Sequence, residues 1–227
     1  MNDRSATTPH GMDDRRRLAL WLALVAFFIA LQYLGRTEGG PSGDPLYSWS
    51  FAIGSVVQEA VVLAIVLALA GFSLDRLALR LPERRWRALG LLIAAFVAIQ
   101  VFGFVYSAIA HPGNEQGLTP DRWEPRHAAA YIVNAAIICT LVPVTEELTF
   151  RGLGYSLLRP YGKWLAILGV GLLFGLSHGL LVSLPVLVFF GCALAWVREQ
   201  TDSVVPGMIV HGAFNLIALV LAVTAQG

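Results

Sequence analysis

The chain contains seven separate runs of apolar residues, most of them about as long as a membrane-spanning helix. A helix needs roughly 20 mainly apolar residues to cross a bilayer, and its backbone must satisfy its own hydrogen bonds there. Of the 227 residues, 56% are hydrophobic and 14% are charged, against about 45–50% and about 25% in soluble domains. We therefore expect an all-α, polytopic membrane helix bundle with spans at about 18–34, 49–71, 88–110, 127–150, 164–182, 184–197 and 204–225.

The polar segments suggest a simple division of the chain. Residues 1–14 are predicted to be a disordered cytoplasmic N-terminus, and residues 15–227 a single membrane domain. The first apolar run follows three arginines as in a signal peptide, but no small-x-small cleavage pattern follows it, so we expect an uncleaved span. Residues 73–87 carry leucines among five arginines. They are expected to lie as a short amphipathic piece on the anionic inner leaflet.

The distribution of basic residues predicts the orientation of the bundle. With the N-terminus inside, twelve of the 16 Lys and Arg residues lie on the cytoplasmic side, three lie outside, and Arg151 lies within a span. Lys and Arg accumulate in cytoplasmic loops. We therefore expect an integral, multi-pass protein with its N-terminus cytoplasmic and its C-terminus outside. Its expected location is a prokaryotic plasma membrane. The net charge of +1 gives no reason to expect nucleic acid as a partner.

Two adjacent glutamates and an arginine, Glu146, Glu147 and Arg151, stand at the end of the fourth apolar run. An ionised group at the centre of a membrane helix costs roughly 2.5–3.5 kcal/mol on insertion scales, and such residues mark functional sites. Glu147 and Arg151 are four residues apart, so they share a helix face and can pair. Glu146 is turned about 100° from Glu147. A structural ion pair would leave one glutamate unexplained, so we favour a functional site in which Glu146 is free to react.

Two histidines and an asparagine are expected on other spans. Phe174 precedes His178 by one helical turn, and we expect His178 to find its polar partner on another helix. His211 and Asn215 share one face of the seventh span. Glycines near both histidines permit close helix approach. With the glutamates, these groups could activate a water and stabilise an oxyanion in a polar intramembrane cavity.

Three motifs, each on its own apolar run, together resemble those of a known family. They are, in chain order, Glu146-Glu147-x-x-x-Arg151, Phe174-x-x-x-His178 and His211-x-x-x-Asn215. This combination resembles the CAAX-protease and bacteriocin-processing family of intramembrane proteases, which includes the Rce1-type prenyl-protein endopeptidases. The resemblance covers about residues 74–220, the expected catalytic core.

The resemblance implies an intramembrane endopeptidase and gives each matching residue a role. Glu146 and His178 would activate the water that attacks the peptide bond. The other four residues would orient this pair or stabilise the oxyanion: Glu147 and Arg151 the former, His211 and Asn215 the latter. The substrate would be a membrane-associated peptide, such as a prenylated CAAX-like peptide, or a membrane-protein segment entering laterally from the bilayer.

Metal dependence is left open by the residue types. Glu146, His178 and His211 could bind zinc, and members of the resembling family have been described both as metalloenzymes and as glutamate-type proteases. The chain lacks the His-Glu-x-x-His spacing of helical zinc sites. We expect that no cofactor is required, with zinc as the stated alternative.

Two other functions could use the same polar cavity. A non-catalytic scaffold or bacteriocin-immunity protein could bind a peptide there, and a proton relay could use the same Glu and His side chains. The proton relay is less favoured because the sequence has no inverted repeat. Glu59 is the one acidic residue within a span outside the three motifs, and its role is left open.

Overall fold

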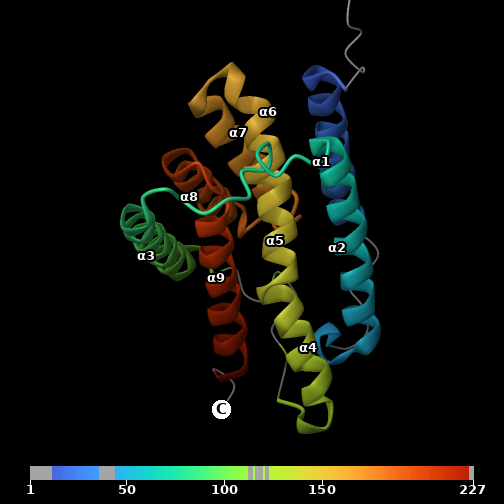
Figure 1. Cartoon of the computed structure of the whole chain (residues 1–227). Coiled ribbons are helices and arrows are strands. Elements are labelled where there is room, and N and C mark those ends of the chain that lie inside the picture. The colour runs from blue at the N-terminus through green and yellow to red at the C-terminus, as the bar shows by residue number, and fades with distance from the viewer. Residues whose placement is uncertain (1–11, 36–43, 112–114, 116–119, 121–122, 225–227) are drawn as a thin grey trace, which may run out of the picture.

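The computed structural model describes residues 12–35, 44–111, 115, 120 and 123–224, and these residues form helices and turns without any strand (Figure 1). Most of the predicted disordered N-terminus, residues 1–11, lies outside the described residues. The α-helices are α1 (Asp14–Gly35), α2 (Trp49–Ala70), α3 (Arg85–Ala110), α4 (Ala128–Cys139), α5 (Leu141–Glu147), α6 (Tyr155–Leu158), α7 (Lys163–Leu176), α8 (Leu184–Thr201) and α9 (Val205–Thr224). The expected all-helical membrane bundle is confirmed.

Helices occur at all seven predicted positions, but five segments are long and apolar enough to cross a membrane: α1, α2, α3, α9 and the combined segment Pro125–Tyr161. The predicted fifth and sixth spans are the shorter α7 and the more polar α8, which fall outside this group. α7 has 14 residues, or about 21 Å, and ends at Leu176 rather than at 182. The turn after it, which carries His178, therefore lies beside the longer helices, and Gly179 in it packs against Gln32 of α1.

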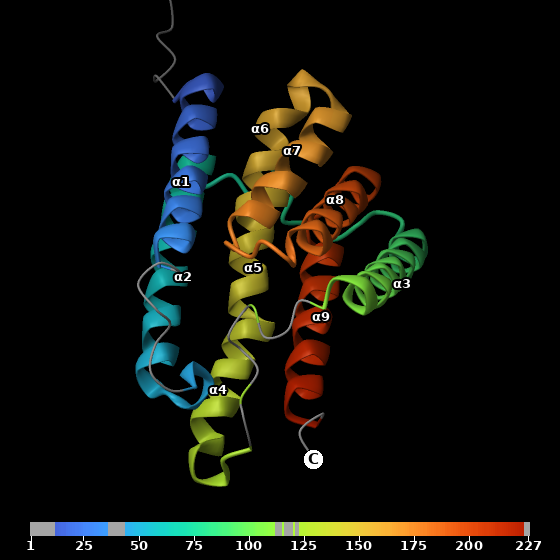
Figure 2. The same ribbon diagram turned by 180° about the vertical axis from the view of Figure 1, so that it is seen from behind.

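The fourth predicted span is part of the column Pro125–Tyr161, which Figures 1 and 2 show between α2 on one side and α9 on the other. Its helical hydrogen bonds are interrupted at Thr140, between α4 and α5. Pro143 explains the interruption, because proline has no N–H to donate and its ring crowds the carbonyl of the residue four positions earlier. That carbonyl belongs to Cys139 and faces Gly212 of α9, where a Cβ would lie only 2.5 Å from the oxygen.

Glycines allow the helices around the column to approach closely. A Cβ on Gly171 of α7 would lie 2.8 Å from the backbone nitrogen of Cys192 on α8, and a Cβ on Gly175 would lie 2.7 Å from Val188. The predicted close approach at these glycines is therefore confirmed. Both cysteines are free and partly buried.

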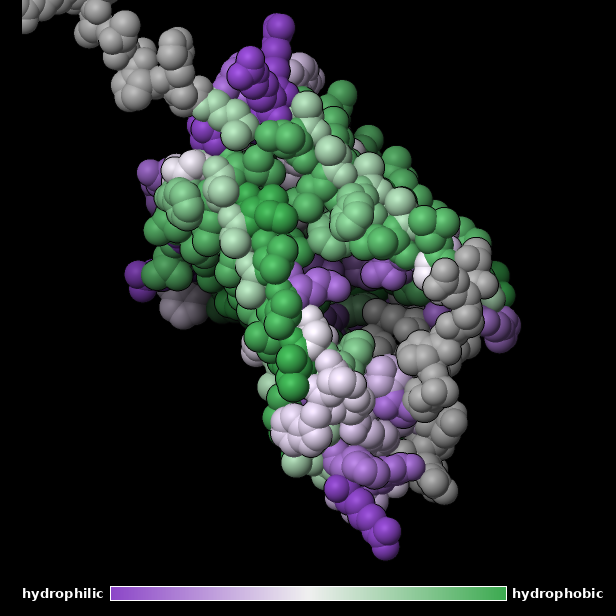
Figure 3. All heavy atoms as spheres, turned by 90° about the vertical axis from the view of Figure 1, so that its right-hand side faces the viewer, coloured by the Kyte–Doolittle hydropathy of each residue, from purple (hydrophilic) through white to green (hydrophobic). Residues whose placement is uncertain are grey.

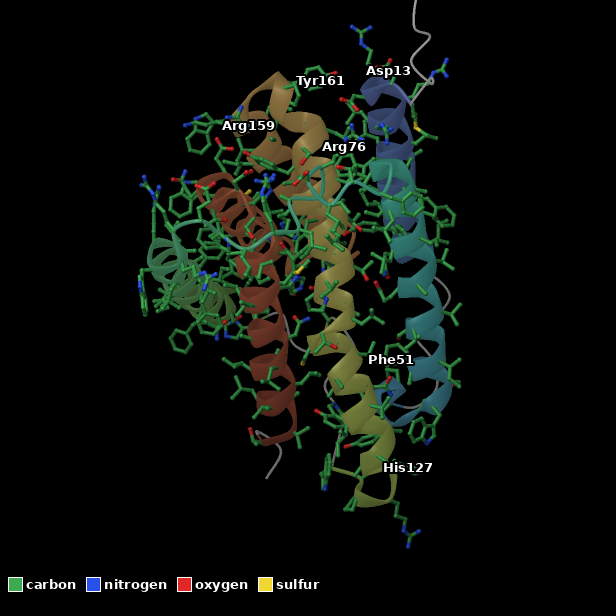
Figure 4. All side chains as sticks on the ribbon, in the orientation of Figure 1. Asp13, Phe51, Arg76, His127, Arg159 and Tyr161 are labelled. Atoms are coloured by element: carbon green, nitrogen blue, oxygen red, sulfur yellow. The ribbon has the colours of Figure 1, made fainter. Side chains whose placement is uncertain are left out.

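The two ends of the bundle carry different side chains. Asp13, Arg76, Arg159 and Tyr161 lie at one end, whereas Phe51 and His127 lie at the other (Figure 4). The predicted amphipathic piece consists of turns up to the start of α3. Within it Leu77 is fully buried while Leu74 and Leu81 are exposed, and Leu77 packs against Gly152 of the column.

Candidate active site

Glu147 and Arg151 form an ion pair that is completely buried. Nη1 of Arg151 donates to Oε1 of Glu147 at 2.9 Å, and both side chains are 0% exposed. Nη2 of Arg151 donates to the carbonyl of Gly191 on α8 at 3.3 Å, and the guanidinium lies 4.2 Å from the centre of the Phe174 ring. The predicted pairing is confirmed, and α8 contributes a partner that the sequence gave no reason to expect.

The segment that follows the two glutamates is a π-helix, η4 (Leu148–Gly154), rather than a continuation of α5. Every residue in it is buried, including Arg151. π-Helical turns are rare and occur frequently at functional sites. The sequence pattern predicts a helix here but not this local widening, which places Arg151 between α5, α7 and α8.

His211 of α9 lies between the two glutamates. Its Nδ1 is 3.2 Å from Oε1 of Glu147, and its Nε2 is 3.4 Å from Oε2 of Glu146. Glu147 is inaccessible, whereas the side chain of Glu146 retains 24% exposure. Gly207 makes room for this arrangement, because a Cβ there would lie 2.6 Å from Oε2 of Glu147. One glutamate is thus fixed in the protein and its neighbour remains accessible.

His178 does not find its bonded partner on another helix, contrary to expectation. Its Nδ1 lies 2.8 Å from the carbonyl oxygen of Phe174, in the last turn of α7. This carbonyl is available because α7 ends at Leu176. No hydrogen bond or ion pair joins His178 to Glu146 within the described part of the chain. The ring of Phe174 instead lies beside both histidines, 4.6 Å from His178 and 5.8 Å from His211 between ring centres.

Asn215 hydrogen-bonds the column next to the interruption between α4 and α5. Its Nδ2 donates to the carbonyl of Ile138 at 2.8 Å, one turn along α9 from His211. Glu59 of α2 is buried at 7% exposure, and α2 packs against α5. Asn215 therefore contacts the column at the α4–α5 interruption, whereas Glu59 lies on a helix that packs against the glutamate-bearing α5.

Phe190 of α8 was not singled out from the sequence. Its ring lies 4.9 Å from His211 and 5.6 Å from Phe174. The Phe189-Phe190-Gly191 triplet is the only local signal for it. Figure 3 shows, on one face of the molecule, a largely apolar surface interrupted by a hollow that contains hydrophilic residues.

The residues named as possible zinc ligands do not converge as a metal site. No group of three or more His, Cys, Asp or Glu side chains within the described part of the chain is arranged to hold a metal ion. His211 is close to both glutamates, whereas no hydrogen bond or ion pair joins His178 to Glu146 or His211 among the described residues. This arrangement does not fit a zinc ion.

Comparison with known families matches residues 128–217 to the type II CAAX prenyl endopeptidase Rce1-like family. This segment is similar to the Rce1-like family. The match confirms the resemblance seen in the three motifs, and the segment contains all six candidate site residues. At the level of the family it implies a CAAX-type endopeptidase activity. Searches of curated proteins and of solved structures give no significant match.

Proposed function

We propose that this protein is an intramembrane endopeptidase that hydrolyses a peptide bond of a membrane-associated, prenyl-CAAX-like peptide. The observation that carries the proposal is the unequal environment of the adjacent glutamates. Glu147 is buried and paired with Arg151, whereas Glu146 is partly exposed, and the His211 ring lies within 3.4 Å of both. A general base must reach the water that it deprotonates, and Glu146 meets that requirement.

His178 is suited to assist Glu146 in activating water. A carbonyl oxygen only accepts hydrogen bonds, so Nδ1 of His178 must carry the proton that it shares with Phe174. In the neutral imidazole this leaves Nε2 with a free lone pair. We infer that a water held between this nitrogen and the Glu146 carboxylate is the nucleophile.

His211 is suited to stabilise developing negative charge. The ring nitrogens of His211 lie 3.2 Å from the Glu147 carboxylate and 3.4 Å from the Glu146 carboxylate, so a ring N–H can donate where charge develops. The buried guanidinium of Arg151 supplies fixed positive charge beside this pair. Fixed positive charge in a site shielded from water favours an oxyanion strongly. Asn215, with one amide hydrogen engaged by Ile138, holds α9 in place and offers its second hydrogen to the oxyanion.

The substrate is proposed to enter laterally from the bilayer, toward a site that opens on the cytoplasmic leaflet of a prokaryotic plasma membrane. The end of the bundle that carries Arg76 and Arg159 (Figure 4) is assigned to the cytoplasm, because Lys and Arg accumulate on that side. With this assignment, the N-terminus is proposed to lie inside and the C-terminus outside.

The proposal is tested by incubating purified protein in detergent with a peptide library that includes farnesylated C-terminal peptides, with and without a chelator. Glu146→Gln should abolish cleavage. Glu83→Gln, the same substitution at an exposed glutamate, should leave it unchanged. Cleavage by the wild type that survives the chelator supports the glutamate-type mechanism, and cleavage lost with the chelator supports the zinc alternative. Peptide binding without cleavage by the wild type would contradict the proposal and favour a scaffold.

A further inference from the structure

The π-helix that carries Arg151 is clamped by two segments outside the family-matched region. Trp21 of α1 is fully buried, and its indole N–H donates to the carbonyl of Thr149 at 2.9 Å. A Cβ on Gly154 would lie 2.2 Å from Cζ2 of Trp21, so the indole ring rests directly on the helix backbone. On Gly152 a Cβ would lie 3.0 Å from the carbonyl oxygen of Leu77. The two glycines of the π-helix therefore mark the places where these segments touch it.

A continuous series of aromatic contacts runs from Trp21 to the candidate catalytic groups. The Trp21 ring meets Phe150 edge-on at 6.4 Å, and Phe150 meets Phe174 edge-on at 5.4 Å. Phe174 in turn contacts three groups of the site: the guanidinium of Arg151, the ring of His178 and the ring of His211. A displacement of Trp21 is therefore transmitted to the site through close-packed rings, because protein interiors transmit strain.

The π-helix needs external support to keep its register. π-Helical turns are rare, and a shift of one residue turns a helical segment by about 100°. Such a shift would carry Arg151 away from Glu147. The indole hydrogen bond ties α1 to one carbonyl of the π-helix, and that bond is made only when the Thr149 carbonyl faces α1.

We propose that Trp21 is a positioning residue of the active site, which holds the π-helix in the register that seats Arg151 against Glu147. α1 then contributes a positioning residue to the site, although this helix lies outside residues 128–217. The effect on catalysis rests on the proposed endopeptidase function, whereas the effect on the seating of Arg151 does not.

The catalytic effect is tested with Trp21→Phe, which keeps an aromatic ring but removes the N–H donor. Trp86→Phe, at a residue that is 86% exposed, is the matched control. We expect Trp21→Phe to lower kcat about tenfold, the factor that corresponds to one hydrogen bond, with KM unchanged because Trp21 does not touch substrate. Gly154→Ala should give the same pattern by displacing the indole. A kcat within twofold of the wild type, or a change confined to KM, would overturn the proposal.

The structural effect is tested by a double-mutant cycle of thermal stability in detergent, which needs no substrate. Trp21→Phe and Glu147→Gln should be coupled, so that the double variant loses clearly less in Tm than the sum of the two single losses. The pair Trp86→Phe and Glu147→Gln should be additive. Additivity in the first cycle would refute the coupling of Trp21 to the buried ion pair. If no peptide is cleaved by the wild type, the proposed function fails while this cycle still decides the positioning role.

Discussion

Removal of the Glu147 charge should destabilise the protein strongly, because Arg151 has no route to solvent. In Glu147→Gln the guanidinium would keep its bond to the Gly191 carbonyl and its contact with Phe174 but lose its only ionic partner on the column. Breaking a buried pair by removing one charge costs about 3–5 kcal/mol. The glutamine oxygen still accepts a neutral hydrogen bond, worth about 1 kcal/mol. We therefore expect a loss of about 3 kcal/mol in the free energy of unfolding.

The loss can be measured by reversible unfolding in SDS mixed micelles, followed by tryptophan fluorescence. Asp75→Asn is the control, because the Arg80–Asp75 pair is exposed at 41% and 91% and should contribute less than about 1 kcal/mol. Replacing the buried pair by apolar residues, as in Glu147→Leu with Arg151→Met, should recover most of the stability and leave no peptidase activity. If Glu147→Gln costs no more than Asp75→Asn, the buried pair does not stabilise the protein in the way argued.

Two further predictions concern packing and pH. Gly212→Ala should lower the free energy of unfolding by about 1–3 kcal/mol, because the new Cβ would press on the Cys139 carbonyl. Gly90 faces open space, so Gly90→Ala should raise the free energy of unfolding by up to about 1 kcal/mol. Unfolding in SDS mixed micelles compares the two variants. Burial acts to raise the pKa of the Glu115 carboxyl, but hydrogen bonds from the backbone N–H groups of residues 181–183 outweigh it and hold the pKa below 4.5. Its stabilising effect is therefore present above pH 4.5 and is lost as the pH falls through the lower folded-state pKa. The Tm difference between wild type and Glu115→Gln should shrink over that range, and a difference that persists at lower pH would contradict this assignment.

The positions of the helices could be predicted because apolar length is a local property. Each apolar run became a helix, and the Glu147–Arg151 pair followed from their spacing alone. The predicted length of the fifth span was wrong because the chain forms a turn at Ser177, His178 and Gly179, with Gly179 at φ +67°. Hydropathy does not register such a turn within an apolar run.

The contacts of the site were harder to predict, because they depend on how the helices rotate against one another. Nδ1 of His178 bonds the last turn of α7, just before it in the chain, although polar groups in membrane spans were expected to pair with other helices. His211 lies between both glutamates because Gly207 lets α9 approach Glu147. The π-helix was missed for a related reason. Nothing in Leu148–Gly154 but its two glycines differs from an ordinary helical sequence, and the residues that contact the wider turn, Trp21 and Leu77, lie elsewhere in the chain.

The column Pro125–Tyr161 has a consequence for hydrophobic mismatch. Its 37 residues extend about 55 Å as a helix, whereas the hydrocarbon core is roughly 30 Å thick. α1 and α2, at 22 residues each, are about 33 Å long and match that thickness. A thicker or thinner bilayer should therefore act on the shorter helices by changing their tilt, whereas the column is longer than the hydrocarbon core is thick. Because Trp21 joins α1 to the π-helix, the proposed hydrolysis should accordingly vary with acyl-chain length.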